Sequence, residues 1–147
     1  MALKPEDAVR KLLIDDSTVS ALVSTRIYPA GSVPQTPQLP YIVTSRVSRS
    51  HTHHMTAGAG LAISRSQIDI YAKTQTKVDT LADGCREALD GYRGTVTNGA
   101  QSLVVKMCHL SNDILVSDIE WAGQNSGTPR ITQDYKIGHS ESVPTFS

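Results

Sequence analysis

The sequence predicts an α+β fold: a single antiparallel β-sheet with a long β-hairpin, packed on one face by two α-helices. Residues 5–23 and 75–90 repeat apolar side chains at intervals of three and four, as amphipathic helices do. Residues 41–50 and 61–71 alternate apolar and polar side chains, as half-buried strands do. Helices on only one side of a sheet leave the other side open to water or to a neighbouring molecule.

The size and composition of the chain indicate one domain, residues 1–147, with a thin core. Hydrophobic residues make up 39% and aromatic residues 5% of the chain, so the core should be aliphatic, and a partner could add burial. Lys and Arg number 14, as do Asp and Glu, which disfavours direct nucleic-acid binding. We expect neither export nor a membrane span, because no apolar run is long enough.

The N-terminal helix should be broken. Pro5 followed by Glu6 and Asp7 is typical of a helix start, because proline suits the first turn and acids there complement the helix dipole. Polar residues then interrupt the apolar stripe, and Ser17 is placed to cap a second helix. Residues 27–28 precede a proline and should therefore be extended.

A long hairpin is expected after a proline-rich loop. Residues 30–40 hold three prolines and a glycine, which excludes a regular element and favours a stiff loop. The strands 41–50 and 61–71 are separated only by residues 51–60. The simplest arrangement is an antiparallel hairpin with residues 51–60 as its tip.

The second half of the chain continues the sheet. Thr74 can cap the helix over residues 75–90, and Gly91 can end it. Asn98-Gly99 predicts a tight turn before a strand over 101–110. Residues 111–118 fit no single pattern.

The chain should end with one more strand and a tail. Residues 130–137 alternate like a strand. Residues 138–147 carry no such pattern and are predicted to be a tail.

Two groups of residues invite a chemical interpretation. Cys85 and Cys108 lack metal-ligand spacing and are expected to be buried free thiols in a reducing compartment. His51, His53 and His54 lie close enough in sequence to bind Zn or Ni. However, no carboxylate or thiolate accompanies them, so an exposed polar tip is the simpler interpretation. We expect no catalytic residues, no resident metal and no cofactor.

Seven short segments, taken in order, resemble the phage tail completion proteins, a family of tail terminator or neck proteins of long-tailed bacteriophages. They are AVRKLL at 8–13, SALV at 20–23, RIYP at 26–29, LPYIV at 39–43, QIDIYA at 67–72, LDGYRG at 89–94 and DY at 134–135. The resemblance covers about residues 5–137, and residues 111–129 depart most from the family pattern.

The resemblance implies a non-enzymatic virion protein, assembled in the host cytoplasm. A homo-oligomeric ring, a hexamer by this resemblance, would cap the head-proximal end of the tail tube, stop tube growth and offer a docking surface to the head–tail connector. DNA would only pass through its lumen. A head-closure stopper or another neck ring protein is the alternative within this class, and a small metal-binding module using the histidine cluster is the alternative outside it.

Contacts between subunits or rings are predicted on the hairpin and on the proline-rich loop. Arginines on the hairpin strands could pair with acids of a neighbour, and the tip and loop could order on assembly. These candidate contact residues are Arg46, Arg49, His51, His53, His54, Met55, Arg65, Gln35 and Leu39.

Overall fold

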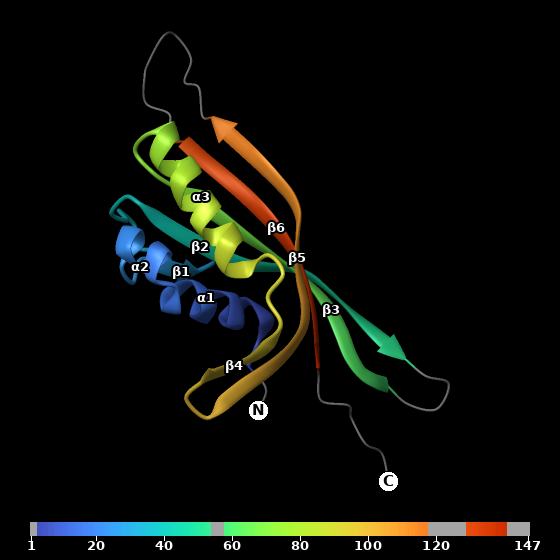
Figure 1. Cartoon of the computed structure of the whole chain (residues 1–147). Helices are drawn as coiled ribbons and strands as arrows, with labels where there is room; N and C mark the ends of the chain where they lie inside the picture. The colour runs from blue at the N-terminus through green and yellow to red at the C-terminus, as the bar shows by residue number, and fades with distance from the viewer. Residues whose placement is uncertain (1–2, 54–57, 118–128, 141–147) are drawn as a thin grey trace.

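The computed structural model of the chain describes residues 3–53, 58–117 and 129–140. Within them, three helices lie on one face of a six-stranded sheet (Figure 1). The helices are α1 (Pro5–Asp15), α2 (Ser17–Val23) and α3 (Gln75–Leu89). The strands are β1 (Ile27–Pro29), β2 (Tyr41–His53), β3 (Gly58–Tyr71), β4 (Gly94–Asn98), β5 (Gln101–Ser117) and β6 (Pro129–Ser140).

The strand order is β1-β2-β3-β6-β5-β4. Every neighbouring pair is antiparallel except β1 and β2, which are parallel. The proline-rich segment 30–40 contains no helix or strand and forms the connection between that parallel pair. The predicted α+β architecture with a long hairpin is therefore confirmed, with one short parallel strand added at its edge.

The broken N-terminal helix is confirmed, but its cap is not Ser17. The Asp16 carboxylate accepts hydrogen bonds from the backbone N–H groups of Thr18 and Val19, both at 3.0 Å. The Asp16 backbone N–H in turn donates to the carbonyl oxygen of Leu12 at 3.2 Å. Asp16 thus ends α1 and begins α2, because an aspartate in extended geometry satisfies the free N–H groups of the next helix.

Helix α3 begins and ends as its sequence predicts, apart from one residue. The Thr74 hydroxyl accepts a hydrogen bond from the Lys77 N–H at 3.2 Å. The helix ends at Leu89, and Gly91 takes a φ of 86°. The Gly91 N–H then donates to the Cys108 carbonyl oxygen at 2.7 Å, which ties the end of α3 to β5.

The core lies between the helices and the sheet and is mainly aliphatic. Its largest fully buried apolar side chains are Tyr135, Leu3, Leu13, Ile27, Ile42, Ile68, Ile70, Leu81, Leu89, Val9 and Val19. Cys85 and Cys108 are buried free thiols, as predicted. Burial raises the pKa of Cys108 to about 12 and raises that of Cys85 further, so neither is a reactive thiolate near neutral pH.

A polar network crosses this core. The Tyr135 hydroxyl donates to the Gln133 side-chain oxygen at 2.8 Å. The Gln133 amide nitrogen donates to the Ala82 carbonyl oxygen at 3.2 Å and to an Asp113 carboxylate oxygen at 3.4 Å. Buried polar groups require hydrogen-bond partners, and the partners of Gln133 link β6 to both α3 and β5.

Strands β5 and β6 are longer than the sequence pattern predicts. Strand β5 runs through residues 111–117, where alternation fails because the register shifts between Leu110 and Asn112. A second register shift lies between Val105 and Met107. The predicted turn at Asn98-Gly99 is confirmed, with a φ of 63° at Gly99.

The prediction that the tail begins at residue 138 is wrong, because β6 continues to Ser140. His139 is buried, and its Nε2 lies 2.8 Å from the Ser64 hydroxyl. Pairing with β3 and this buried hydrogen bond hold the strand where its sequence has no apolar pattern. Residues 141–147 lie outside the described residues.

Candidate assembly surfaces

The hairpin of β2 and β3 extends beyond the helices (Figure 1). Its two strands pair from Tyr41↔Tyr71 to His53↔Gly58. The predicted tip, residues 51–60, is therefore partly strand, and residues 54–57, which include His54 and Met55, lie outside the described residues. The backbones of His51 and His53 belong to β2, whereas their side chains are not among those described.

A β-bulge in β2 sets the direction of the hairpin arginines. Val47 is the extra residue, because Arg46 is opposite Ser66 and Ser48 is opposite Arg65. Simple alternation predicts Arg46 and Ser48 on the same face, and the bulge makes this wrong. Instead Arg46 shares a face with Arg49, which is opposite the buried Ser64.

Among the described residues, Arg46 and Arg49 form no ion pair. Arg46 is exposed and borders a shallow depression together with Glu6 and Asp7 at the start of α1. Arg49 is half-buried, and its Nε is enclosed without a hydrogen-bond partner. The other guanidinium nitrogens of this half-buried side chain are the donors that a neighbouring molecule could reach.

The third predicted arginine, Arg65, lies on the opposite face of the sheet. Its guanidinium group forms an ion pair with Asp134 of β6 at 3.3 Å. The structure therefore separates Arg65 from the other two arginines and gives it a partner within the chain.

The sheet face without helices carries an aromatic ladder of Tyr28, Tyr41 and Tyr71, which the sequence pattern did not predict. The ring centroids of Tyr28 and Tyr41 are 6.2 Å apart, and those of Tyr41 and Tyr71 are stacked at 4.6 Å. The Arg130 guanidinium group lies 5.8 Å from the Tyr71 ring centroid. Burial raises the pKa of Tyr41. Tyr28 is the middle residue of β1, Tyr41 begins β2 and Tyr71 ends β3, and only strand register brings the three together.

The same open face combines a polar cross-strand pair with exposed apolar side chains. The Thr132 hydroxyl donates to Asp69 at 2.6 Å. Ile63 on β3 is 45% exposed, and Ile114, opposite Thr132 on β5, is 46% exposed. Isolated exposed isoleucines are ordinary, but together with the aromatic ladder they make this face suitable for contact.

The proline-rich loop is held at both ends. The Ala30 N–H donates to the Thr44 carbonyl oxygen at 2.8 Å, and Arg26 Nε donates to the Pro40 carbonyl oxygen at 2.9 Å. Gln35 is exposed and Leu39 is half-buried. Both predicted contact residues therefore lie on the surface of a loop that the chain itself anchors.

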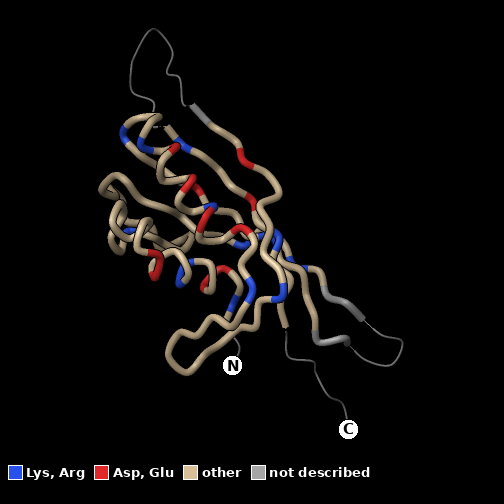
Figure 2. The backbone as a smooth tube through the Cα atoms, viewed as in Figure 1, with Lys and Arg blue, Asp and Glu red and all other residues tan. Residues whose placement is uncertain are grey.

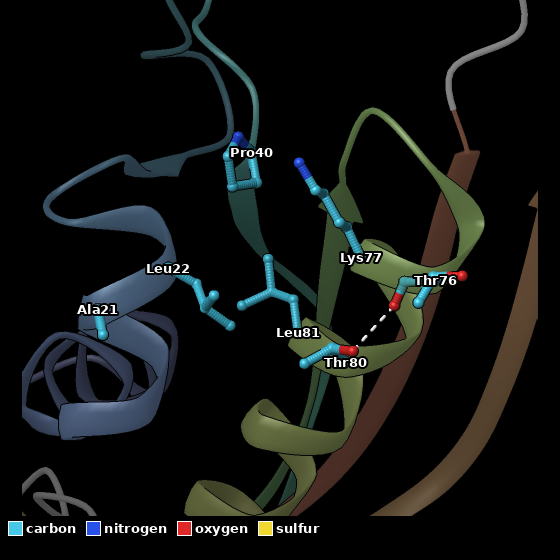
Figure 3. Close-up of a pocket in the computed structure, with 7 residues that line it drawn as sticks. All are labelled: Ala21, Leu22, Pro40, Thr76, Lys77, Thr80 and Leu81. Carbon is cyan, nitrogen blue, oxygen red and sulfur yellow. Dashed lines mark hydrogen bonds between the residues drawn. The ribbon is translucent and has the colours of Figure 1, made fainter.

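A mostly apolar groove of about 280 Å³ lies between α2 and α3. Leu22 of α2 and Leu81 of α3 face each other across it, with Pro40 and Lys77 at one end (Figure 3). Leu22 is 38% exposed. The groove has no cluster of convergent polar groups, so its chemistry suits an apolar side chain better than a polar small molecule.

The described part of the chain offers no metal centre: no three His, Cys, Asp or Glu residues are grouped to hold an ion. The side chains of the predicted histidine cluster lie outside that part. None of the helices described is both long and apolar enough to cross a bilayer.

Comparisons with known proteins agree with this architecture. The family model described as tail completion protein gp17 matches residues 7–114. A chain from a structure of the virion of a native gene transfer agent particle has the same fold, with a TM-score of 0.67, 19% identity and coverage of 92% of this chain and 94% of that chain. No curated protein matches significantly. Because the family match spans well over half of its length, the chain belongs to the tail completion protein gp17 family of structural phage virion proteins.

Proposed function

We propose that this virion tail protein is a tail terminator. Copies of the chain, six by the family resemblance, close into a ring at the head-proximal end of the tail tube. The ring stops tube growth and forms the docking surface for the head–tail connector. The ring assembles in the host cytoplasm before it joins the virion, and DNA only passes through its lumen.

The observation that carries this proposal is the β2–β3 hairpin, which extends past the helices and bears two arginines without an ion-pair partner among the described residues. A ring requires two unlike surfaces on each subunit, which meet when rotation closes. The hairpin is one such surface, and the helical side of the molecule is a different one (Figure 1).

The predicted contact residues have separate roles in this proposal. Arg46 and Arg49 contact the adjacent subunit, whereas the tip with His51, His53, His54 and Met55 contacts the adjacent ring or the tube. Gln35 and Leu39 contact a neighbour through the proline-rich loop. Arg65 stays paired with Asp134, and it takes part only where a neighbouring molecule also contacts the Asp134 carboxylate. The absence of net charge suits a channel that does not hold DNA tightly.

Removal of the gene from its phage tests the proposal. A terminator knockout should produce tubes longer than those of the parent, visible by electron microscopy, and the purified protein should form rings in negative stain. Tails of normal length beside unsealed heads would instead assign the protein to head closure. Normal virions from the knockout would reject both roles.

A further inference from the structure

Helix α3 presents an acidic stripe on its uncovered side. Asp79, Asp83 and Glu87 follow each other at intervals of four and are all exposed, so they lie on one face of the helix. Arg86 is the basic residue closest to them in sequence, and it already pairs with Asp90 at 3.5 Å. The stripe therefore keeps three carboxylates without an ion pair in the described part of the chain.

The apolar groove adjoins this stripe. Thr76 and Thr80 line the groove and precede Asp79 and Asp83 on the helix surface. The surface formed by α2 and α3 therefore combines an apolar depression, which contains Leu22 and Leu81 with Lys77 at one end (Figure 3), with a row of negative charges beside it. Such a surface fits a partner that has an apolar side chain next to cations.

The bulge segment, residues 46–49, has that composition. Val47 is 49% exposed and is flanked by Arg46 and Arg49, which share one face. Bulges re-aim side chains out of the regular ladder. Figure 2 shows a group of basic residues where the strands cross, while both acidic and basic residues occur along the helices.

We propose that the bulge segment of one copy docks on the α2–α3 surface of the next, with Val47 in the groove and Arg46 and Arg49 beside Asp79, Asp83 and Glu87. The occupant is a second copy because both complementary surfaces belong to this chain. Within one chain they do not meet: the bulge segment lies beside the start of α1, and no ion pair joins it to α3 in the described residues. The contact is head-to-tail, so it can close a ring.

This inference rests on the proposed ring but adds which surfaces form it. Glu6 and Asp7 lie near Arg46 in its own chain and reduce its share of the attraction. Arg49 does not border these two carboxylates and is therefore the stronger determinant. Val47 adds apolar burial that exposed ion pairs alone do not supply.

Cross-linking tests the contact directly. Leu22→Cys and Val47→Cys are introduced together into the full-length protein, and the ring is oxidised and run on a non-reducing gel. The native thiols Cys85 and Cys108 are buried and stay reduced. We expect a ladder of covalent oligomers, which the single variants lack. Leu22→Cys with Val104→Cys is the matched control, because Val104 is similarly exposed but lies on β5.

Charge exchange tests the electrostatic part. Arg49→Glu should weaken ring formation at least about tenfold, because like charges then face each other. Combining Arg49→Glu with Glu87→Arg in the same chain should restore ring formation. Arg93→Glu makes the same change in net charge outside both surfaces and should leave ring formation unchanged. Circular dichroism confirms that each variant is folded.

The outcomes separate this inference from the proposed function. A ladder together with rescue by the exchanged charges supports the contact. Rings that form normally in Arg49→Glu, with no ladder from the Leu22–Val47 cysteine pair, overturn the contact but leave the terminator proposal intact. If the unmodified protein forms no ring, alone or with tail tubes, both proposals are overturned.

Discussion

At the residue scale, burial decides the chemistry of the few polar groups in the core. Gln133 is the centre of the core network, because it bonds to a tyrosine on its own strand, to a helix carbonyl and to an aspartate of β5. The two cysteines lie in the same layer between the helices and the sheet, and their raised pKa values follow first from desolvation.

Tyr135→Phe should lower the free energy of unfolding by about 1–2 kcal/mol. The substitution keeps the ring but leaves the buried Gln133 oxygen without its donor. Urea denaturation measures the change. Tyr28→Phe is the control and should alter stability little, because Tyr28 is only half-buried. Equal effects of the two substitutions would contradict the role given to the network.

Stability should fall as the pH rises above about 9. Below that pH the thiols are protonated in both states. Above it Cys85 and Cys108 ionise in the unfolded chain, while their raised pKa values keep them neutral in the fold. Each thiol then removes about 1.4 kcal/mol per pH unit. Urea unfolding at increasing pH measures the slope, and Cys108→Ala should reduce it. A slope that is zero up to about pH 11 would show that burial does not protect the thiols.

At the element scale, capping residues and bulges determine where helices end and which way strand residues face. Asp16 separates two helices that share an apolar stripe. The bulge at Val47 places Arg46 and Arg49 on one face. The register shift near Met107 brings β5 against Gly138 of β6. Each feature is a local exception to periodicity, and each affects a surface or a junction of the fold.

Asp16→Ala should destabilise the protein by about 0.5–2 kcal/mol, because it removes the cap of α2. Asp15→Ala is a matched control. It removes the same charge from the adjacent position, where the carboxylate only forms an exposed ion pair with Lys11 at 3.2 Å, so it should cost less than about 1 kcal/mol. Thermal and urea denaturation compare the two. The cap assignment fails if Asp15→Ala is the more destabilising substitution.

Gly138→Ala should destabilise the protein by about 1–3 kcal/mol, because a Cβ atom there would lie 2.9 Å from Cγ of Met107. Met107→Ala in the same chain should recover part of that loss. A double-mutant cycle by urea denaturation measures the coupling between the two sites. If the two changes in the free energy of unfolding are strictly additive, β5 moves away from β6 in Gly138→Ala at no cost in stability.

At the scale of the whole molecule, the part that stabilises the fold differs from the part that we propose contacts other copies. The helices bury the core on one face of the sheet, whereas the hairpin extends past them (Figure 1). Close to the helices the hairpin contributes Ile42, Ile68 and Ile70 to that core. Farther out it presents two arginines that form no ion pair within the described residues. A subunit with this shape can lose the end of its hairpin and still fold.

Replacing residues 52–61 by Asn-Gly should leave the melting temperature and ring formation nearly unchanged but reduce binding of the ring to tail tubes. His51 and Ala62 face each other across the two strands, so a two-residue turn can join them. Circular dichroism, native mass spectrometry and co-sedimentation with tail tubes measure folding, ring formation and tube binding. Normal binding of the shortened protein to tail tubes would show that the end of the hairpin is not an assembly element.

The sequence by itself determined the helices, the hairpin, the tight turn at Asn98-Gly99 and the buried thiols, because each depends on periodicity or on local turn chemistry. The family resemblance was likewise present in the order of short segments, and the match over residues 7–114 confirmed it.

Only the tertiary structure decided which surfaces the chain presents. The ladder of Tyr28, Tyr41 and Tyr71, the ion pair that engages Arg65, and the extension of β6 to Ser140 all depend on strand partners far away in sequence. The bulge at Val47 reverses the direction of the side chains of residues 48–50 relative to simple alternation. Side-chain direction in a sheet has a period of two, so a shift of one residue that no local pattern encodes changes which face meets a neighbour.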